Sequence, residues 1–191
     1  MNDWIENITS TWKGHREFAT WLVSELKPKE IVELGVTEGY STFRWATANA
    51  HLNSDGMVTG IDQNVHESIY NHIINHGLTG IEIVETDDFA EAAVDWDRKV
   101  EIVHLHGDNS REVVNSKFVN WIALLAEDGI LMFHGVNVGT PEVGAEGWFN
   151  DLQIEGYKKG KFQSSNGLGI LTKNLKLFEK IVEKYPEIQI G

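Results

Sequence analysis

The sequence predicts an α/β protein in which helices cover both faces of a mostly parallel sheet, a three-layer sandwich that closes with a terminal antiparallel strand. Short β-type runs alternate with helix-type segments between residues 30 and 134, which is the pattern of βαβ units. The last two β-type runs follow each other around turn residues, as in a hairpin. The 191 residues, of which 41% are hydrophobic, suit one domain with its own core. We therefore expect residues 1–191 to form a single domain.

The expected elements follow in chain order. Residues 1–29 form a predicted N-terminal helical segment, because Phe18, Leu22 and Leu26 have helical spacing and Pro28 follows them. Five strands are expected at residues 30–34, 57–61, 81–85, 100–105 and 129–134. Helices are expected between them at residues 41–50, 67–75, 89–94 and 111–125. The chain ends with a predicted helix at 148–155, strands at 161–163 and 167–171, and an amphipathic helix at 175–184.

Composition excludes several classes of function. The net charge is −13, and a phosphate backbone or an anionic membrane repels such a chain, so we expect neither nucleic acid nor membrane as a partner. The chain contains no cysteine, which excludes disulfides, thiolate metal sites and a cysteine nucleophile. The first residues lack the basic and apolar stretches of a secretory signal, and no apolar run is long enough to cross a bilayer. We expect a cytoplasmic protein.

The first predicted strand leads through a glycine-containing turn into a helix. Gly35 and Gly39 lie in this turn, at the carboxyl end of the strand, where open α/β sheets bind their ligands. The G-x-G-x-x-G pattern that seats a pyrophosphate is absent, which disfavours a nicotinamide-dependent reductase. The acidic Glu33 precedes the turn and repels a pyrophosphate, whereas it suits a cationic ligand. The turn therefore predicts a nucleoside site of another kind.

Acidic residues follow the next two predicted strands. Asp62 ends the second strand, where a carboxylate accepts hydrogen bonds from ribose hydroxyls. Asp88 and Phe89 follow the third strand, where an acid and an aromatic ring suit an adenine amino group and its ring. Asp62 or Asp88 taken alone is equally explained as a helix cap. Their order after three successive strands favours nucleoside binding.

Several segments, in the same order along the chain, resemble a known family. They are Trp12–Phe18, Val32–Gly35, Asp88–Ala92, Phe133–Val138 and Gly167–Leu171. On these segments the sequence resembles class I S-adenosylmethionine-dependent methyltransferases, and among them the small methyltransferase domains (family 24) associated with glycosyltransferases and with glycan or antibiotic-sugar modification. The resemblance implies a Rossmann-like methyltransferase fold and S-adenosylmethionine as cofactor. The cofactor residues that it implies are Glu33, Gly35, Gly39, Asp62, Asp88 and Phe89.

The chain departs from this family where its metal-dependent members keep their acids. In those members, acids that follow strands four and five hold a divalent ion. Here His106 and Gly135 replace two acids and Asn109 replaces a histidine. Magnesium prefers oxygen ligands, so we expect no metal of that kind. The carboxyl ends of strands four and five are expected to bring His106, Asp108 and His134 together as catalytic residues.

Three interpretations stay open. The first is a metal-independent methyltransferase in which His106 or His134 takes a proton from a hydroxyl or amine of a small molecule or sugar. The second is a histidine and aspartate site for a softer metal such as zinc, manganese or iron. The third is a binding or interaction protein that keeps the methyltransferase fold without its catalysis. A homodimer is left open as the assembly.

Other segments are expected near the acceptor. Residues 135–147, which are rich in glycine, are predicted to be a flexible loop at the active-site end. His15 is a candidate for facing the pocket from the N-terminal segment. Trp12, Trp45, Trp121 and Trp148 are expected to anchor the core, with Trp12 or Trp148 as a possible stacking surface for an acceptor.

Overall fold

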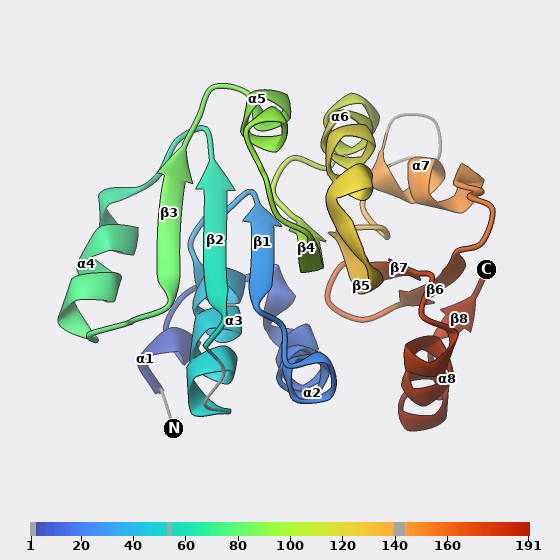
Figure 1. Ribbon diagram of the computed structural model, residues 1–191, viewed down its shortest axis with the longest axis horizontal. Helices are drawn as coiled ribbons and strands as arrows, with labels where there is room; N and C mark the ends of the chain where they lie inside the picture. The colour runs from blue at the N-terminus through green and yellow to red at the C-terminus, as the bar shows by residue number, and fades with distance from the viewer. Residues whose placement is uncertain (1–2, 53–54, 140–143) are drawn as a thin grey trace.

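A computed structural model describes residues 3–52, 55–139 and 144–191 (Figure 1). Its centre is one eight-stranded sheet with the order β3-β2-β1-β4-β5-β7-β6-β8. The strands are β1 (Glu30–Leu34), β2 (Met57–Asp62), β3 (Ile81–Glu85), β4 (Val100–Leu105), β5 (Leu125–His134), β6 (Lys158–Phe162), β7 (Leu168–Thr172) and β8 (Gln189–Ile190). Strands β1 to β5 pair in parallel, whereas β7, β6 and β8 are added antiparallel. The predicted fold class is confirmed, with three antiparallel strands at the end of the sheet.

Helices cover both faces of the sheet, and each face has its own hydrophobic core. The helices are α1 (Asp3–Glu6), α2 (Arg16–Leu26), α3 (Tyr40–His51), α4 (Glu67–Asn75), α5 (Phe89–Val94), α6 (Arg111–Trp121), α7 (Ala145–Asp151) and α8 (Leu175–Lys184). Two short 3₁₀ helices, η1 (Thr11–His15) and η2 (Ile122–Leu124), join them. One core packs α2, α3 and α8 on the sheet, with Leu22, Phe43 and Ile181 fully buried. The other packs α5, α6 and α7 on the opposite face, around Trp121 and Phe133.

Local chemistry sets the end of α2 and the start of α8. Helix α2 ends at Leu26, and its C-cap, Lys27, has a φ of 46° and directly precedes Pro28. Proline disfavours the helical conformation of the residue before it, as the sequence predicted. Helix α8 begins after Asn174, whose side-chain oxygen accepts a hydrogen bond from the Leu177 N–H at 3.0 Å. This helix has the predicted bounds.

Some element boundaries differ from the prediction. The helix expected to reach residue 125 ends at Trp121, because the chain passes through η2 into β5. Strand β5 begins at Leu125 rather than residue 129, and its register against β4 shifts before Ile130. The strand predicted at 161–163 begins at Lys158, since pairing with β7 outweighs the weak β-propensity of a lysine-rich segment.

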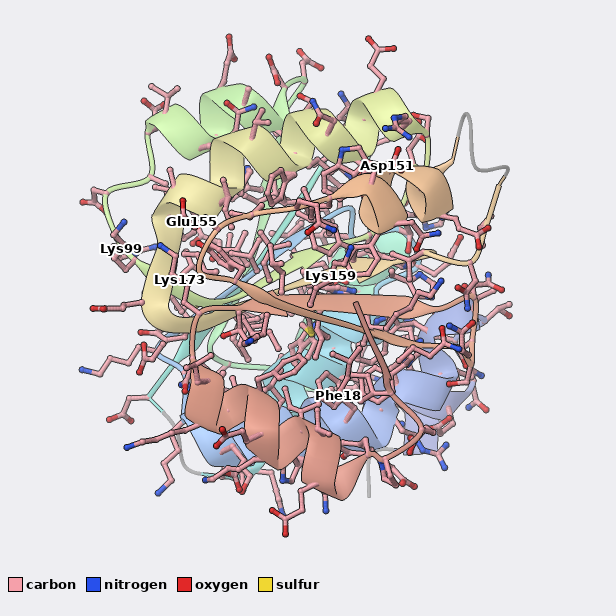
Figure 2. The ribbon with its side chains drawn as sticks, turned by 90° about the vertical axis from the view of Figure 1, so that its right-hand side faces the viewer. Phe18, Lys99, Asp151, Glu155, Lys159 and Lys173 are labelled. Atoms are coloured by element: carbon pink, nitrogen blue, oxygen red, sulfur yellow. The ribbon has the colours of Figure 1, made fainter. Side chains whose placement is uncertain are left out.

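Helix α7 corrects two predictions at once. It begins at Ala145 rather than residue 148 and ends at Asp151 rather than 155. Its first turn therefore includes residues 145–147, which were expected to belong to a flexible loop. Residues 140–143 of that predicted loop lie outside the described residues. The Lys159 ammonium group donates to the carbonyl oxygens of Phe149, Asn150 and Leu152 at 3.0–3.1 Å, which satisfies the end of α7. Figure 2 shows Lys159 between β6 and α7.

Candidate active site at the carboxyl ends of the parallel strands

The turn after β1 is held in a conformation that glycine permits. Gly35 has a φ of 104°, Thr37 of 51° and Gly39 of 81°. The Gly35 N–H donates to the Ile61 carbonyl at 2.7 Å, which ties the turn to β2. A Cβ atom on Gly35 would lie 2.7 Å from the carbonyl carbon of His106, and closer still to its oxygen. The turn and the end of β4 therefore touch through backbone atoms, and only glycine fits between them.

The predicted ribose and adenine residues lie along the same edge of the sheet. The Asp62 carboxylate accepts the Thr37 N–H at 3.0 Å and the Gln63 N–H at 2.7 Å, so it already binds the turn. Asp88 is exposed, and its carboxylate accepts the Ala90 N–H at 2.7 Å as the N-cap of α5. Phe89, half-buried, is the first residue of that helix. Through these contacts Asp62 stabilises the turn and Asp88 stabilises the start of α5, in addition to any role in binding a ligand.

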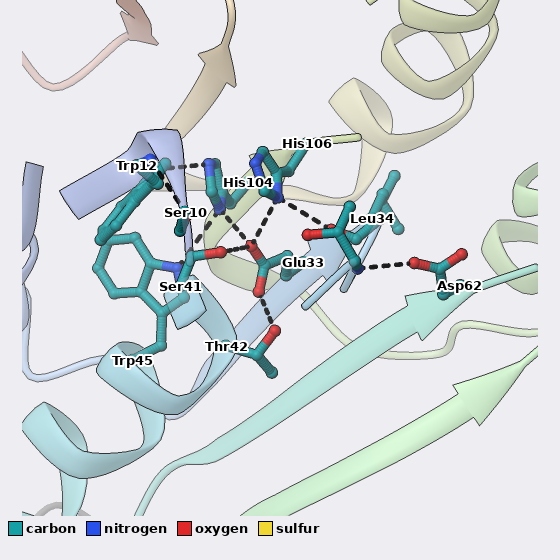
Figure 3. Close-up of polar contacts among 12 residues, drawn as sticks. Ser10, Trp12, Glu33, Leu34, Ser41, Thr42, Trp45, Asp62, His104 and His106 are labelled. Atoms are coloured by element: carbon teal, nitrogen blue, oxygen red, sulfur yellow. Dashed lines mark hydrogen bonds and ion pairs between the residues drawn. The ribbon is translucent and has the colours of Figure 1, made fainter. Parts of the chain in front are cut away.

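Glu33 lies beneath the turn and is fully buried (Figure 3). Its carboxylate accepts hydrogen bonds from the hydroxyl groups of Ser41 and Thr42 in the first turn of α3. The Nδ1 atom of His104 lies 2.9 Å from Glu33 Oε1. Burial raises the pKa of Glu33, while the nearby His106 and the hydrogen bonds from Ser41 and Thr42 act to lower it. Glu33 therefore fastens β1, β4 and the start of α3 together.

The tautomer of His104 follows from its partners. The Trp12 indole donates its N–H to His104 Nε2 at 3.1 Å, and the Trp45 indole donates to His104 Nδ1 at the longer distance of 3.4 Å. Glu33 Oε1 lies closer to Nδ1, at 2.9 Å, and accepts a proton from it, so we assign the proton to Nδ1 and none to Nε2 (Figure 3). Burial lowers the pKa of His104 to about 3, which agrees with a neutral ring. Sequence reasoning missed His104, which lies inside β4.

The structure brings the predicted histidines together. The rings of His106 and His134 lie 4.8 Å apart between their centroids. His106 Nδ1 lies 3.2 Å from the Gly35 carbonyl oxygen, and His134 Nε2 lies 2.9 Å from the Ser165 carbonyl oxygen. A carbonyl only accepts, so these two nitrogens carry the protons. In the neutral rings, His106 Nε2 and His134 Nδ1 are left as the proton-accepting atoms.

Both histidines are weak bases in this environment. Burial lowers the pKa of His106 to about 3 and that of His134 to about 4. The Glu33 carboxylate acts against burial, because its Oε1 atom lies 3.8 Å from His106 Nδ1. His15 lies next to His134: the two rings are 5.8 Å apart, and His15 Nε2 donates to the same Ser165 carbonyl at 3.3 Å. His15 is buried and does not line the cavity that His106 and His134 share.

His106 and His134 line a small cavity with Asp108, Asn109 and Lys117. Its volume is about 10 Å³, close to what one water molecule needs. The Asp108 carboxylate is exposed and accepts the Ser110 N–H at 2.7 Å. A Cβ atom on Gly135 would lie 2.6 Å from Cγ of Asn109, so the amide occupies the space that a side chain at 135 would need. The two substitutions noted in the sequence thus fit each other.

Lys117 is the second residue of the site that the sequence analysis missed. It belongs to α6 yet is only 2% exposed, and its ammonium group donates to the His106 carbonyl at 2.7 Å and to the Leu34 carbonyl at 3.1 Å. A signal was present, because positions 114, 117, 118 and 121 have the spacing of one helix face. The other three are apolar and buried, so a lysine among them indicates a buried charge.

All four tryptophans expected to anchor the core are buried. Trp12 and Trp148 therefore present no open face to an acceptor. The Trp148 indole donates to the Asn115 side-chain oxygen at 3.0 Å, and its ring packs on Phe118 and Phe133.

A family model described as a methyltransferase domain matches residues 32–136, more than half of the chain. The chain belongs to this methyltransferase family. The match runs from β1 to the end of β5 and includes the turn, Glu33 and all three predicted catalytic residues. The protein y4gI of Sinorhizobium fredii is 29% identical over 174 residues, which cover 85% of this chain and 19% of that protein. The chain thus spans about a fifth of the length of this relative.

Solved structures share the methyltransferase fold at low sequence identity. Cofactor-bound Rv0187 from MTB has a TM-score of 0.69 and 12% identity, with 84% of this chain and 80% of that one covered. The O-methyltransferase TomG from Streptomyces achromogenes, in complex with S-adenosylmethionine, has a TM-score of 0.59 and 15% identity, with 85% and 86% covered. The methyltransferase PaMTH1 from Podospora anserina, bound to S-adenosylhomocysteine, has a TM-score of 0.65 and 11% identity, with 83% and 77% covered. The family and these structures support the predicted cofactor, S-adenosylmethionine.

The residues of this methyltransferase domain fit the cofactor along the carboxyl ends of the strands. They lack the metal ligands of the family's metal-dependent members. The turn glycines serve packing, because a Cβ atom on Gly35 would meet the His106 backbone and one on Gly39 would meet the side chains of Phe43 and Ile69. At the carboxyl ends of β2 and β3, by contrast, Asp62, Asp88 and Phe89 keep exposed surface that a nucleoside can reach. Across the described residues, no group of three histidine or acidic side chains is arranged to hold a metal ion. Within the same parts of the chain, none of the helices combines the length and apolarity needed to span a membrane.

Proposed function

We propose that this protein is a metal-independent methyltransferase that transfers the methyl group of S-adenosylmethionine to a hydroxyl or amine of a small molecule, with sugars as the leading acceptor class. One observation carries the proposal: the glycine turn after β1 meets the end of β4 beside two histidines whose unprotonated nitrogens are left over. The O-methyltransferase TomG, which has the same fold and binds S-adenosylmethionine, supports it. We propose that residues 1–191 act as one unit in this reaction.

In this proposal the cofactor binds along the carboxyl ends of β1, β2 and β3. The start of α3 offers backbone N–H groups, because its N-cap, Gly39, has no side chain to accept from them, and Asp62 accepts from the ribose hydroxyls. Asp88 and Phe89 lie where the adenine is expected. Glu33 acts as a positioning residue, because its carboxylate is already bound to Ser41, Thr42 and His104. Its negative charge also favours a cationic ligand.

The bound cofactor supplies an electrophilic methyl group on a positively charged sulfur. Held beside Asp62, Asp88 and Phe89, the cofactor would give this methyl group to an acceptor hydroxyl, and the electron pair of the broken carbon–sulfur bond would stay on sulfur in a neutral thioether. His106 Nε2 or His134 Nδ1 takes the hydroxyl proton, directly or through one water in the cavity between them. Glu33, 3.8 Å from His106 Nδ1, stabilises the imidazolium that forms. Asp108 lines the same cavity and is proposed to orient the acceptor.

The proposal has a two-stage test. Titration calorimetry with S-adenosylmethionine and S-adenosylhomocysteine is expected to show binding, and the absence of heat with both at millimolar concentration contradicts the cofactor assignment. A panel of sugars, phenols and amines is then screened for formation of S-adenosylhomocysteine. With an active acceptor, His106→Ala or His134→Ala is expected to lower kcat by about 10²–10⁴, the usual contribution of a general base. His72→Ala, on the distant helix α4, is the matched control and is expected to leave kcat unchanged.

A second candidate is a binding protein on the same fold. It is favoured by the small cavity between His106 and His134 and by the low pKa of both rings, about 3 and about 4. It predicts cofactor binding without turnover on any acceptor. Unchanged turnover in both alanine variants would instead support the methyltransferase activity and contradict the role of the histidines as bases.

A further inference from the structure

A buried positive charge lies where the strand order of the sheet reverses. The Lys117 ammonium group bridges the carbonyls of Leu34, the last residue of β1, and His106, the first residue after β4. Strands β1 and β4 are neighbours, with β2 and β3 on one side and β5 on the other. Ligands of open α/β sheets bind outside the carboxyl ends of the strands at this point. Lys117 therefore brings its charge to the expected ligand site.

The surroundings of Lys117 are the residues that we propose for the cofactor. Its Nζ atom lies 4.3 Å from the centre of the Phe89 ring, a cation–π contact. A Cβ atom on Gly107 would lie 3.9 Å from Nζ and 3.6 Å from the Cα of Gly35. Two carbonyls and one aromatic ring face the three N–H bonds of the ammonium group. The charge is thus fixed in place.

Charged groups on three sides keep Lys117 protonated at neutral pH. Burial lowers its pKa to about 8, whereas Asp62 at the end of β2, Asp108 after β4 and Glu33 in β1 act to raise it. The nearest titratable group of β4, His104, is neutral, because its pKa is about 3. Below pH 8 the site therefore contains a buried cation.

We propose that Lys117 determines cofactor specificity, by weakening the binding of the sulfonium cofactor relative to the neutral thioether product. This inference rests on the proposed function. S-adenosylmethionine and S-adenosylhomocysteine share their adenosine, amino and carboxyl groups and differ by one methyl group and one positive charge. A fixed ammonium group repels the charged ligand and leaves the neutral one unaffected. The repulsion disappears when the methyl group leaves, so Lys117 favours transfer and retains the product.

The test compares dissociation constants by titration calorimetry. The two ligands are titrated into the wild type and into Lys117→Met, which keeps an unbranched side chain as far as Cε and removes the charged ammonium group. The ratio of the S-adenosylmethionine to the S-adenosylhomocysteine dissociation constant is expected to fall about tenfold in Lys117→Met, which corresponds to about 1.4 kcal/mol. Lys159→Met is the matched control, because Lys159 also donates to backbone carbonyls and lies 5.4 Å from an aromatic ring, that of Phe149. It belongs to β6, outside the proposed site, and is expected to keep the wild-type ratio.

A second measurement follows the same ratio as the pH rises from 7 to 9, through the pKa of Lys117. The ratio is expected to fall more in the wild type and in Lys159→Met than in Lys117→Met, where only the amino groups of the ligands titrate. If both ligands bind, and the ratio neither changes in Lys117→Met nor falls more with pH in the wild type than in that variant, the inference is wrong and the proposed function stands. If the folded wild type binds neither ligand, the proposed function fails, and this inference fails with it.

Discussion

Replacing Gly35 by alanine tests the contact between the turn after β1 and the end of β4. Gly35 has a φ of 104°, so backbone strain from a side chain there lowers the free energy of unfolding by about 1–2 kcal/mol. The new Cβ atom would also meet backbone atoms of His106, within 2.7 Å of its carbonyl carbon. Forcing one extra carbon into a packed site costs a further 1–3 kcal/mol, roughly. We expect Gly35→Ala to lower the free energy of unfolding by about 2–5 kcal/mol.

Gly156→Ala is the matched control for this prediction. Gly156 has a φ of 81°, but a Cβ atom there would have no heavy atom within 4 Å. Its expected loss is therefore the backbone part alone, about 1–2 kcal/mol. Urea denaturation followed by tryptophan fluorescence measures both losses, and for a domain of this size each kcal/mol lowers Tm by about 2–4 °C. Losses that agree within about 0.5 kcal/mol would refute the close contact between Gly35 and His106.

Three further predictions concern the residues around the site. The four buried histidines His15, His104, His106 and His134 have a pKa of about 3 or 4 in the folded chain, below 6.5 in the unfolded one. Protonation of the unfolded chain is thus expected to lower the free energy of unfolding as the pH falls from 6.5 toward 4, by up to about 1.4 kcal/mol per pH unit for each histidine. Urea denaturation at pH 7, 6 and 5 measures this loss, and equal stability at pH 7 and 5 would contradict it. Asp88→Ala is expected to cost about 1 kcal/mol through loss of the α5 N-cap, whereas Asp88→Asn keeps the cap and is expected to weaken only cofactor binding in calorimetry. Trp12→Phe leaves His104 Nε2 without its donor and is expected to cost about 1–3 kcal/mol in urea denaturation, and a loss below 0.3 kcal/mol, roughly, would argue against the assigned tautomer.

The sequence predicts the parallel part of the sheet well, including β3, a half-buried strand at one edge. Residues 30–34, 81–85 and 100–105 are recovered with their predicted bounds. In a chain where β-type runs alternate with helices, aliphatic runs bounded by turns are best explained as strands of a parallel sheet. The antiparallel edge, which ends at β8, is harder to predict. Strand β8 has two residues, and only its pairing with β6 makes it a strand.

The site divides in a similar way. The turn glycines and His106 and His134 are predictable, because the carboxyl ends of adjacent parallel strands must lie together. Lys117 is harder to place, since a lysine in a helix usually faces water and a pattern search counts it as polar. His104 belongs to a strand interior, where its partners Trp12 and Glu33 come from distant parts of the chain. Such contacts follow from packing and not from local spacing.

The turn between β6 and β7 gives the site a late position in folding. The Ser165 carbonyl binds both His15, which is 150 residues earlier, and His134. Closing so long a loop costs entropy that is recovered only when the final contacts form, and the chain emerges from the ribosome N-terminus first. Both imidazoles therefore gain their hydrogen bonds to Ser165 only after the β6–β7 hairpin has formed. We expect the nascent chain to complete its nucleoside-binding edge before it completes its histidine cluster.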